Sequence, residues 1–270
     1  MSWIWAVLAP HPPIIVPDVG RGREREAALT IEGIDGLTRR IAAAERPERI
    51  LLLSPHQPYA LGSLALNRAR AIRGSFSPFG APSVVFDLRT PLVEVDALYD
   101  FLGARNVPVS FVELHDLTRD QGAMVPLYFL ENALNGLPQT TLGNAVGMTP
   151  EAAFQLGRAL AAYDDGMKWG LVASGDLSHR LTPDAPAGYS PHGEAFDRAV
   201  VQALERTDPA PLLELSPRVR EDAGECGLRS IMTLLGLCAE LGAKIDVLSY
   251  EGPFGVGYCN AGWIREGAER

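Results

Sequence analysis

The chain has 270 residues, of which 47% are hydrophobic and 21% are charged, and it carries a net charge of −9. These values are ordinary for a globular protein that is long enough to bury a substantial core. The acidic balance and the lack of a lysine or arginine cluster argue against nucleic acid as a partner.

The cysteines are too few for a disulfide framework in a chain of this size: Cys226, Cys238 and Cys259. Unpaired thiols suit a reducing compartment. The apolar start at 2–10 has no basic flank and is too short for a signal peptide. No run approaches the roughly 20 apolar residues that a membrane helix needs. We therefore expect a cytoplasmic protein without a membrane-spanning segment.

In the first half of the chain, short apolar runs alternate with stripes of apolar residues at helical spacing. The runs predict buried strands, and an apolar residue at every third or fourth position predicts a helix. Strands are expected at 4–8, 50–53 and 108–114, extended segments at 61–71 and 83–88 with a breaker-rich loop at 74–82 between them, and helices at 24–44 and 92–102.

The same alternation continues through the second half, where Pro126 is expected in the first turn of a helix and Thr149-Pro150-Glu151 opens the next one. We predict a single α/β domain over 1–270, with a central, largely parallel or mixed β-sheet flanked by helices. Strands are expected at 140–146, 169–174 and 245–250, helices at 122–134, 150–163, 196–204 and 228–241, a loop at 182–191 and a glycine-rich tail at 252–262.

Two of the predicted strands end in the same dipeptide, Pro10-His11 after the first and Pro55-His56 after the second. A proline directly after a strand cannot donate to the ladder and favours extended backbone before it. Each histidine is therefore expected on stiff backbone just beyond a strand end, where open α/β sheets place their ligands. On this basis we predict that His11 and His56 bind one metal ion.

A third histidine, His179, follows the strand at 169–174 through Gly175-Asp176-Leu177-Ser178. A lone histidine more often makes a local hydrogen bond, and we interpret His115 and His192 in that way. Three histidines at successive strand ends are harder to explain locally, because the ends of a parallel sheet converge on one surface. His179 suits proton transfer, since an ordinary imidazole titrates at about pH 6.5. A serine hydrolase is disfavoured because the chain has no Gly-x-Ser-x-Gly elbow.

The chain has no His-Glu-x-x-His motif, so a further metal ligand must come from elsewhere. Glu225 is the candidate carboxylate, since it lies in Gly224-Glu225-Cys226-Gly227 just ahead of an apolar helix. Two histidines and one carboxylate form the ligand set associated with non-haem Fe(II) and oxygen chemistry. Two alternatives stay open: Glu225 only caps the following helix, or Cys226 supplies a thiolate ligand.

Four motifs together resemble the class III extradiol ring-cleaving dioxygenases. The similarity is to the catalytic subunit of protocatechuate 4,5-dioxygenase, to stand-alone bacterial homologues of that subunit and, more distantly, to Memo proteins. Each motif is short, but their order and spacing are specific, and the match spans nearly the whole chain. The motifs are Ala9-Pro10-His11-Pro12-Pro13, Ser54-Pro55-His56, Gly175-Asp176-Leu177-Ser178-His179 and Gly224-Glu225-Cys226-Gly227.

The resemblance implies that His11, His56 and Glu225 bind Fe(II) and that His179 is the catalytic acid–base. It also implies a small catechol-like aromatic substrate that chelates the iron, O2 as co-substrate, and ring opening beside the diol. Many members carry a substrate-facing histidine before a Val-Pro-Leu helix start. Gln121 stands there in this chain, and it can hydrogen-bond to substrate but cannot carry a proton.

The departure at Gln121 keeps two other functions open. One is a Memo-like binding protein that retains the cleft without ring cleavage, and in those proteins a cysteine near the position of Cys226 is also found. The other is a zinc-dependent hydrolase that uses the same residues, with zinc or another divalent metal in place of iron. Family members commonly associate, so the resemblance also allows a homo-oligomer.

Overall fold

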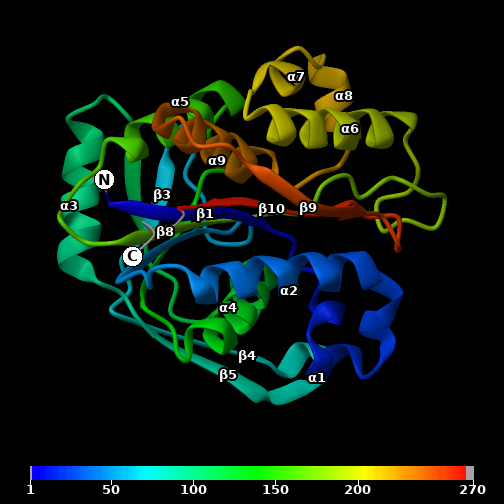
Figure 1. The fold of residues 1–270 in the computed structure, drawn as a ribbon, viewed down its shortest axis with the longest axis horizontal. Helices are drawn as coiled ribbons and strands as arrows, with labels where there is room; N and C mark the ends of the chain where they lie inside the picture. The colour runs from blue at the N-terminus through cyan, green and yellow to red at the C-terminus, as the bar shows by residue number, and fades with distance from the viewer. Residues whose placement is uncertain (1, 266–270) are drawn as a thin grey trace.

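The computed structural model describes residues 2–265, which form a central β-sheet between two layers of helices (Figure 1). In the described residues eight strands make this sheet, in the order β6-β3-β7-β2-β8-β1-β10-β9, with parallel and antiparallel pairs. The α/β fold with a mixed central sheet that the sequence predicts is confirmed. The strands are β1 (Trp3–Ala9), β2 (Arg49–Leu53), β3 (Leu64–Asn67), β6 (Val109–Val112), β7 (Gln139–Asn144), β8 (Trp169–Ser174), β9 (Asp246–Glu251) and β10 (Tyr258–Ile264).

The middle of the sheet is a parallel block in which β7, β2, β8 and β1 are neighbours. Successive side chains of these strands enter the cores on opposite faces. In β1, for example, Ala6 and Leu8 pack on one side while Val7 and Ala9 pack on the other. Strands covered on both faces need the continuous apolar runs seen in the sequence. Because the four strands share a direction, the residues that follow them lie at one edge of the sheet.

The helices divide between the two faces of the sheet (Figure 1). On one face, α5 and α9 pack together against the strands, with α6, α7 and α8 beside them, and on the other face lie α2 and α4. Within residues 2–265 no helix has the length and apolar character of a membrane span. The α-helices are α1 (Pro17–Gly20), α2 (Ala28–Ala43), α3 (Leu92–Gly103), α4 (Gln121–Leu134), α5 (Pro150–Ala161), α6 (Pro191–Arg206), α7 (Ala210–Leu213), α8 (Pro217–Asp222) and α9 (Leu228–Leu241), and short 3-10 helices cover Pro13–Ile15, Arg23–Ala27 and Ser77–Phe79.

The predicted loop at 74–82 is too long, because strands occupy both of its ends and only 77–80 connect them. β4 (Ala71–Phe76) and β5 (Ala81–Arg89) form a separate two-stranded sheet below α4 (Figure 1). Phe76 and Phe86 are buried and their rings meet edge to face, with centroids 5.9 Å apart. Burial of these aromatic side chains overrides the turn preference of the glycine and proline residues in this segment.

The predicted glycine-rich tail at 252–262 is also partly wrong. Its second half belongs to β10, which lies inside the sheet and pairs antiparallel with both β1 and β9. Gly262 faces the backbone of β1 so closely that a Cβ atom would stand 2.9 Å from the carbonyl oxygen of Ala6. The glycine is therefore required by close packing within a strand, a use of glycine that composition alone does not distinguish from a loop.

Helix α4 begins earlier than the sequence predicts. Asp120 is its N-cap, so Gln121 is the first helical residue and Pro126 lies inside the helix rather than in its first turn. The missing N–H of Pro126 removes one bond of the helical ladder. This early start places Gln121 at the carboxyl edge of the parallel strands, where the candidate site lies.

Candidate metal centre

The carboxyl ends of β2, β8 and β1 bring three chain segments together, because these strands are adjacent in the sheet. His11 follows the last residue of β1 by two positions, His56 follows that of β2 by three, and Asp176 follows that of β8 by two. The two Pro-His dipeptides that stand far apart in the sequence therefore meet in space.

His11 is buried, with 2% of its surface exposed. Its backbone N–H donates to Asp176 Oδ1 at 2.8 Å, and its Nδ1 lies 2.9 Å from Ser174 Oγ. Burial, assisted by the charge of His56, lowers the pKa of His11 to about 3, so its imidazole is neutral at pH 7. With the proton on Nδ1 and donated to Ser174, the lone pair of Nε2 is free, as metal binding requires.

His56 is exposed at the edge of the sheet, and its Nε2 lies 3.2 Å from Nε2 of His11. Nε2 of Gln121 is 3.3 Å from the same His56 nitrogen. Two nitrogen atoms bound to one metal ion at about 2.1 Å, with coordination angles of about 90–109°, are about 3.0–3.4 Å apart. The separation of the two imidazole nitrogens fits two ligands of one ion.

Asp120 connects the segment that carries His56 to helix α4. Its Oδ1 accepts hydrogen bonds from Ser54 Oγ at 2.6 Å and from a backbone N–H in the first turn of α4 at 2.8 Å. Its Oδ2 accepts a hydrogen bond from the side chain of Gln57. A buried carboxylate with this many donors is well satisfied. Asp120 thereby holds His56 and Gln121 at a defined distance from each other.

His11, Asp176 and Cys226 have ligand atoms that all lie within 4.8 Å of one another, and no other such group occurs in residues 2–265. Cys226 Sγ and Asp176 Oδ2 are each 3.6 Å from His11 Nε2. A sulfur at about 2.3 Å and a nitrogen at about 2.1 Å from one ion are about 3.6 Å apart at a tetrahedral angle. Together with His56, these donors fit a divalent metal ion.

Burial raises the pKa values of the carboxyl of Asp176 and the thiol of Cys226 above their ordinary values. The raised pKa of Cys226 keeps its thiol protonated at neutral pH. Binding of a metal through sulfur therefore requires that this proton be released. The His11 imidazole and the Cys226 thiol are therefore neutral donors in the metal-free protein, and the thiol becomes charged when a metal binds.

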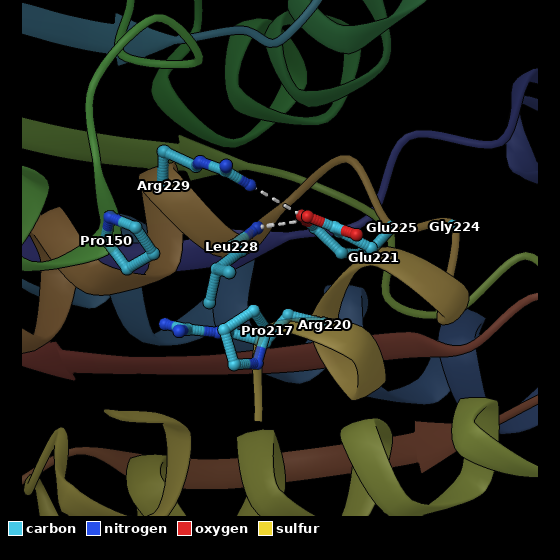
Figure 2. Close-up of a pocket in the computed structure, with 8 residues that line it drawn as sticks. All are labelled: Pro150, Pro217, Arg220, Glu221, Gly224, Glu225, Leu228 and Arg229. Atoms are coloured by element: carbon cyan, nitrogen blue, oxygen red, sulfur yellow. Dashed lines mark hydrogen bonds and ion pairs between the residues drawn. The ribbon is translucent and has the colours of Figure 1, made fainter. Parts of the chain in front are cut away.

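Glu225, the carboxylate that the sequence suggested as a ligand, does not join this group. Its Oε2 accepts a hydrogen bond from the backbone N–H of Leu228 at 2.6 Å, and its Oε1 pairs with Arg229 Nη1 at 2.8 Å (Figure 2). The carboxylate thus caps the first turn of α9, which is one of the alternatives that the sequence left open. Its neighbour Cys226 is the residue of this motif that faces His11.

His179 lies close to the group of His11, Asp176 and Cys226 that could hold a metal ion, without belonging to it. Its charge contributes to lowering the pKa values of both His11 and Asp176, which requires that it be close to them. Its backbone N–H donates to Ala223 O at 3.2 Å. Its Nδ1 is buried and has no hydrogen-bond partner within the described part of the chain. That nitrogen is therefore a buried polar atom that the described residues leave unsatisfied.

The other two histidines make contacts elsewhere. His115 is exposed, and its Nε2 lies 3.7 Å from a carboxylate oxygen of Glu113. His192 Nδ1 lies 2.9 Å from Asp222 Oδ2 and connects helix α6 to the end of α8. Neither histidine joins the group around His11, but the contact of His192 is with a residue 30 positions away rather than the local hydrogen bond that the sequence suggested.

Asp197, a residue of helix α6, binds the loop that carries His179. It is fully buried, and its Oδ1 accepts a hydrogen bond from the backbone N–H of Ser178 at 2.8 Å. The hydroxyl of Tyr250 donates to Oδ2 at 2.9 Å. Burial is the largest influence on this carboxyl and raises its pKa to about 7.

We expect Asp197 to make the stability of the protein depend on pH. Its pKa of about 7 in the folded state lies above the value of about 3.9 in an unfolded chain, so its contribution declines as pH rises from about 4 to about 7. Asp197→Asn, which cannot ionise, should remove this decline and should gain stability relative to the wild type above pH 7. Urea unfolding at pH 5 and pH 8 measures the difference, and equal changes at both values would contradict it.

Sequence reasoning found His11, His56 and the alternatives Glu225 and Cys226, but it gave Asp176 no part in the metal site. The signal for Asp176 was its place two residues after a predicted strand. Ser174 and Asp120 were also missed, because their roles are hydrogen bonds to segments that are distant in sequence. Such partners become visible only when the sheet brings the strand ends together.

Comparison with known proteins gives one family match. Residues 5–260 match a family model described as the catalytic LigB subunit of aromatic ring-opening dioxygenase. Protein CA_C1420 of Clostridium acetobutylicum is 34% identical over 260 residues, which are 93% of this chain and 55% of that protein. The chain therefore spans little more than half the length of this relative.

A solved structure has the same fold. The crystal structure of uncharacterized protein JW3007 from Escherichia coli K12 superposes with a TM-score of 0.61, covering 96% of this chain and 99% of that one. The two sequences are 15% identical, so this likeness concerns the fold alone.

Proposed function

The chain belongs to the family of catalytic LigB subunits of aromatic ring-opening dioxygenases, and on that premise we propose that it is a non-haem Fe(II)-dependent extradiol-type dioxygenase. Its substrates would be a small catechol-like aromatic compound and O2. The observation that carries the proposal is the 3.2 Å separation of the Nε2 atoms of His11 and His56, at the strand ends where a metal-dependent site is expected.

In this proposal His11, His56 and Cys226 hold the metal ion, with Asp176 beside them as a further oxygen donor. Cys226 takes the place in the ligand set that the sequence analysis gave to Glu225, because its sulfur faces His11. The metal would supply a Lewis acid and a template that orients the diol and O2. A thiolate donor also suits zinc, so metal analysis of the purified protein decides between iron and zinc.

His179 would act as the acid–base group. Its imidazole, which lies close to His11 and Asp176, can accept a proton from a substrate hydroxyl and return it to the opening ring. Gln121 would contribute a hydrogen-bond donor next to His56 without moving a proton. Both atoms of O2 enter the product of an extradiol cleavage, so no external reductant is consumed. The free cysteines favour a cytoplasmic location, and a homo-oligomeric state is part of the same proposal.

We expect the Fe(II)-loaded protein to consume O2 with at least one member of a panel of catechols. His179→Ala should lower this rate by about 100-fold or more, the usual contribution of a general acid–base group, while Fe(II) affinity stays close to that of the wild type. Oxygen uptake and anaerobic Fe(II) titration measure the two effects. His192→Ala is the matched control and should leave both unchanged.

The second candidate function is a Memo-like metal-binding protein without ring cleavage. The observations that favour it are the thiol of Cys226 in the metal-ligating group and the amide of Gln121 beside His56. Fe(II) binding without oxygen uptake on any diol would support this function instead. If the protein binds Zn²⁺ and hydrolyses a member of an ester panel, the result would support a zinc-dependent hydrolase instead of the dioxygenase or the binding protein.

A further inference from the structure

We infer that Glu225 and Arg229 form a positioning pair that holds Cys226 in place to bind the metal. The inference rests on the proposed role of Cys226 as a ligand. It gives Glu225 a function in the metal centre that is different from ligation, and it adds Arg229, which lies outside every motif of the sequence.

The pair connects the turn that carries Cys226 to the first turn of α9. Glu225 Oε1 accepts from Arg229 Nη1 at 2.8 Å and its Oε2 accepts from the N–H of Leu228 at 2.6 Å (Figure 2). The side chain of Glu225 is only 6% exposed. Both carboxylate oxygens are therefore engaged by residues of the first turn of α9. Separating a buried carboxylate from its cation is costly.

Arg229 is itself anchored to a third segment. Its Nε lies 3.4 Å from the carbonyl oxygen of Met148, in the loop that precedes helix α5. Arg229, Glu225 and Gly224 line one pocket with a volume of about 330 Å³, where the Arg229 side chain is 30% exposed while Glu225 stays buried (Figure 2). The turn is thus fixed to α9 and to the loop before α5 by one guanidinium group.

The inner side of the turn is held by the loop that follows β8. The N–H of Gly227 donates to Asp176 O at 3.0 Å, and the N–H of Asp176 donates to Cys226 Sγ at 3.4 Å. A Cβ atom on Gly175 would stand 2.3 Å from the Cα of Gly227, so the two backbones are in direct contact. Cys226 stands in sequence between Glu225 and Gly227, both of which are held by these bonds, and its sulfur faces His11.

A ligand role and a positioning role for Glu225 predict opposite effects when Arg229 is removed. If Glu225 were a ligand, loss of the arginine would free its carboxylate and leave metal affinity equal or higher. If the pair positions Cys226, loss of the arginine leaves a buried carboxylate without its cation, and the turn shifts to expose it. Metal affinity then falls.

The experiment is a Co²⁺ titration of the full chain, followed through the near-ultraviolet charge-transfer absorption of a thiolate bound to cobalt. Wild type, Glu225→Ala, Arg229→Ala, the double variant and Cys226→Ser are compared. Arg198→Ala is the matched control, since Arg198 pairs with Glu194 at the same four-residue spacing on the exposed face of α6. Unfolding of each metal-free variant by urea shows whether it folds.

We expect Glu225→Ala and Arg229→Ala each to weaken Co²⁺ binding by about 10–100-fold, the usual effect of losing a group that orients a ligand. At saturating Co²⁺ both should retain the thiolate absorption. The Co²⁺ affinity of the double variant should be no lower than that of either single variant, because the two residues act as one unit. Arg198→Ala should bind like the wild type.

Unchanged or tighter binding by Arg229→Ala would overturn the positioning pair while leaving Cys226 as a ligand. A thiolate absorption that persists in Cys226→Ser would instead overturn the proposed ligand set, and the pair with it. Where the alanine variants do not fold, Arg229→Gln keeps a donor for Glu225 without the charge. It should still weaken binding, and wild-type affinity in a folded Arg229→Gln protein overturns the inference.

Discussion

Replacing His11 with alanine should weaken Fe(II) binding by more than about 100-fold, because even residues that only orient a ligand contribute about 10–100-fold. His56→Ala should have an effect of the same size, since the Nε2 atoms of the two histidines lie 3.2 Å apart and would share one ion. The double variant should bind no more weakly than either single one within the range of the measurement. Anaerobic titration with Fe(II) gives the affinities.

His115→Ala is the control for this result, since His115 is exposed and contacts Glu113 outside the metal-ligating group. It should bind Fe(II) like the wild type. Equal affinity of wild type and His11→Ala would contradict the shared metal site and the function built on it. Cys226→Ser, measured in the same series, separates the thiolate from the histidines, and we expect it to weaken binding without abolishing it.

The largest effect on stability is expected from Gly157→Ala in helix α5. An added Cβ atom would stand 2.0 Å from the carbonyl oxygen of Thr233 in α9 and 2.7 Å from the N–H nitrogen of Leu237. Gly236 makes the reciprocal approach, with a Cβ position 2.1 Å from the carbonyl oxygen of Phe154. These neighbours are backbone atoms of a packed helix, so they cannot turn aside as a side chain would.

We expect Gly157→Ala to lower the free energy of unfolding by about 3 kcal/mol, at the upper end of the usual range for overpacking. The corresponding fall in Tm is about 6–12 °C for a domain of this size. Because α9 begins directly after the turn that carries Cys226, a shift of α9 should also weaken Fe(II) binding. Thermal unfolding and Fe(II) titration measure the two consequences.

Gly103→Ala, at the end of helix α3, is the matched control, because a Cβ atom there has no atom within 4 Å. It should leave stability equal or slightly higher, as expected where alanine replaces glycine in a helix. If Gly157→Ala and Gly103→Ala unfold at the same urea concentration, the close contact between α5 and α9 does not limit the stability of the protein.

The sequence by itself determined the parallel centre of the sheet and the two histidines at its edge. β1, β2 and β8 are buried on both faces, so their apolar runs are continuous and short, and the breaker that follows each one marks its end. The N-cap of α5 is equally local, since Thr149 accepts from the N–H of Ala152 three residues later. Signals of this kind need no information from the rest of the chain.

Tertiary structure decided which residues of each motif face the site. Glu225 and Cys226 are adjacent in sequence, and either can bind a metal. The choice between them depends on Arg229 and Leu228, which engage the carboxylate, and on Asp176, which contacts the sulfur. No local pattern records those contacts, because Asp176 lies 50 residues away from the sulfur it touches.

Dependence on residues that are distant in sequence also explains why β10 was missed. The central position of β10 follows from its pairing with β1, at the opposite end of the chain, and its glycine is required by that contact. Local propensity describes how a segment behaves alone, whereas a sheet position is set by its partners. Local sequence signals therefore identify the strand ends that carry candidate site residues. Which of those residues contact one another depends on the pairing of the strands in the folded sheet.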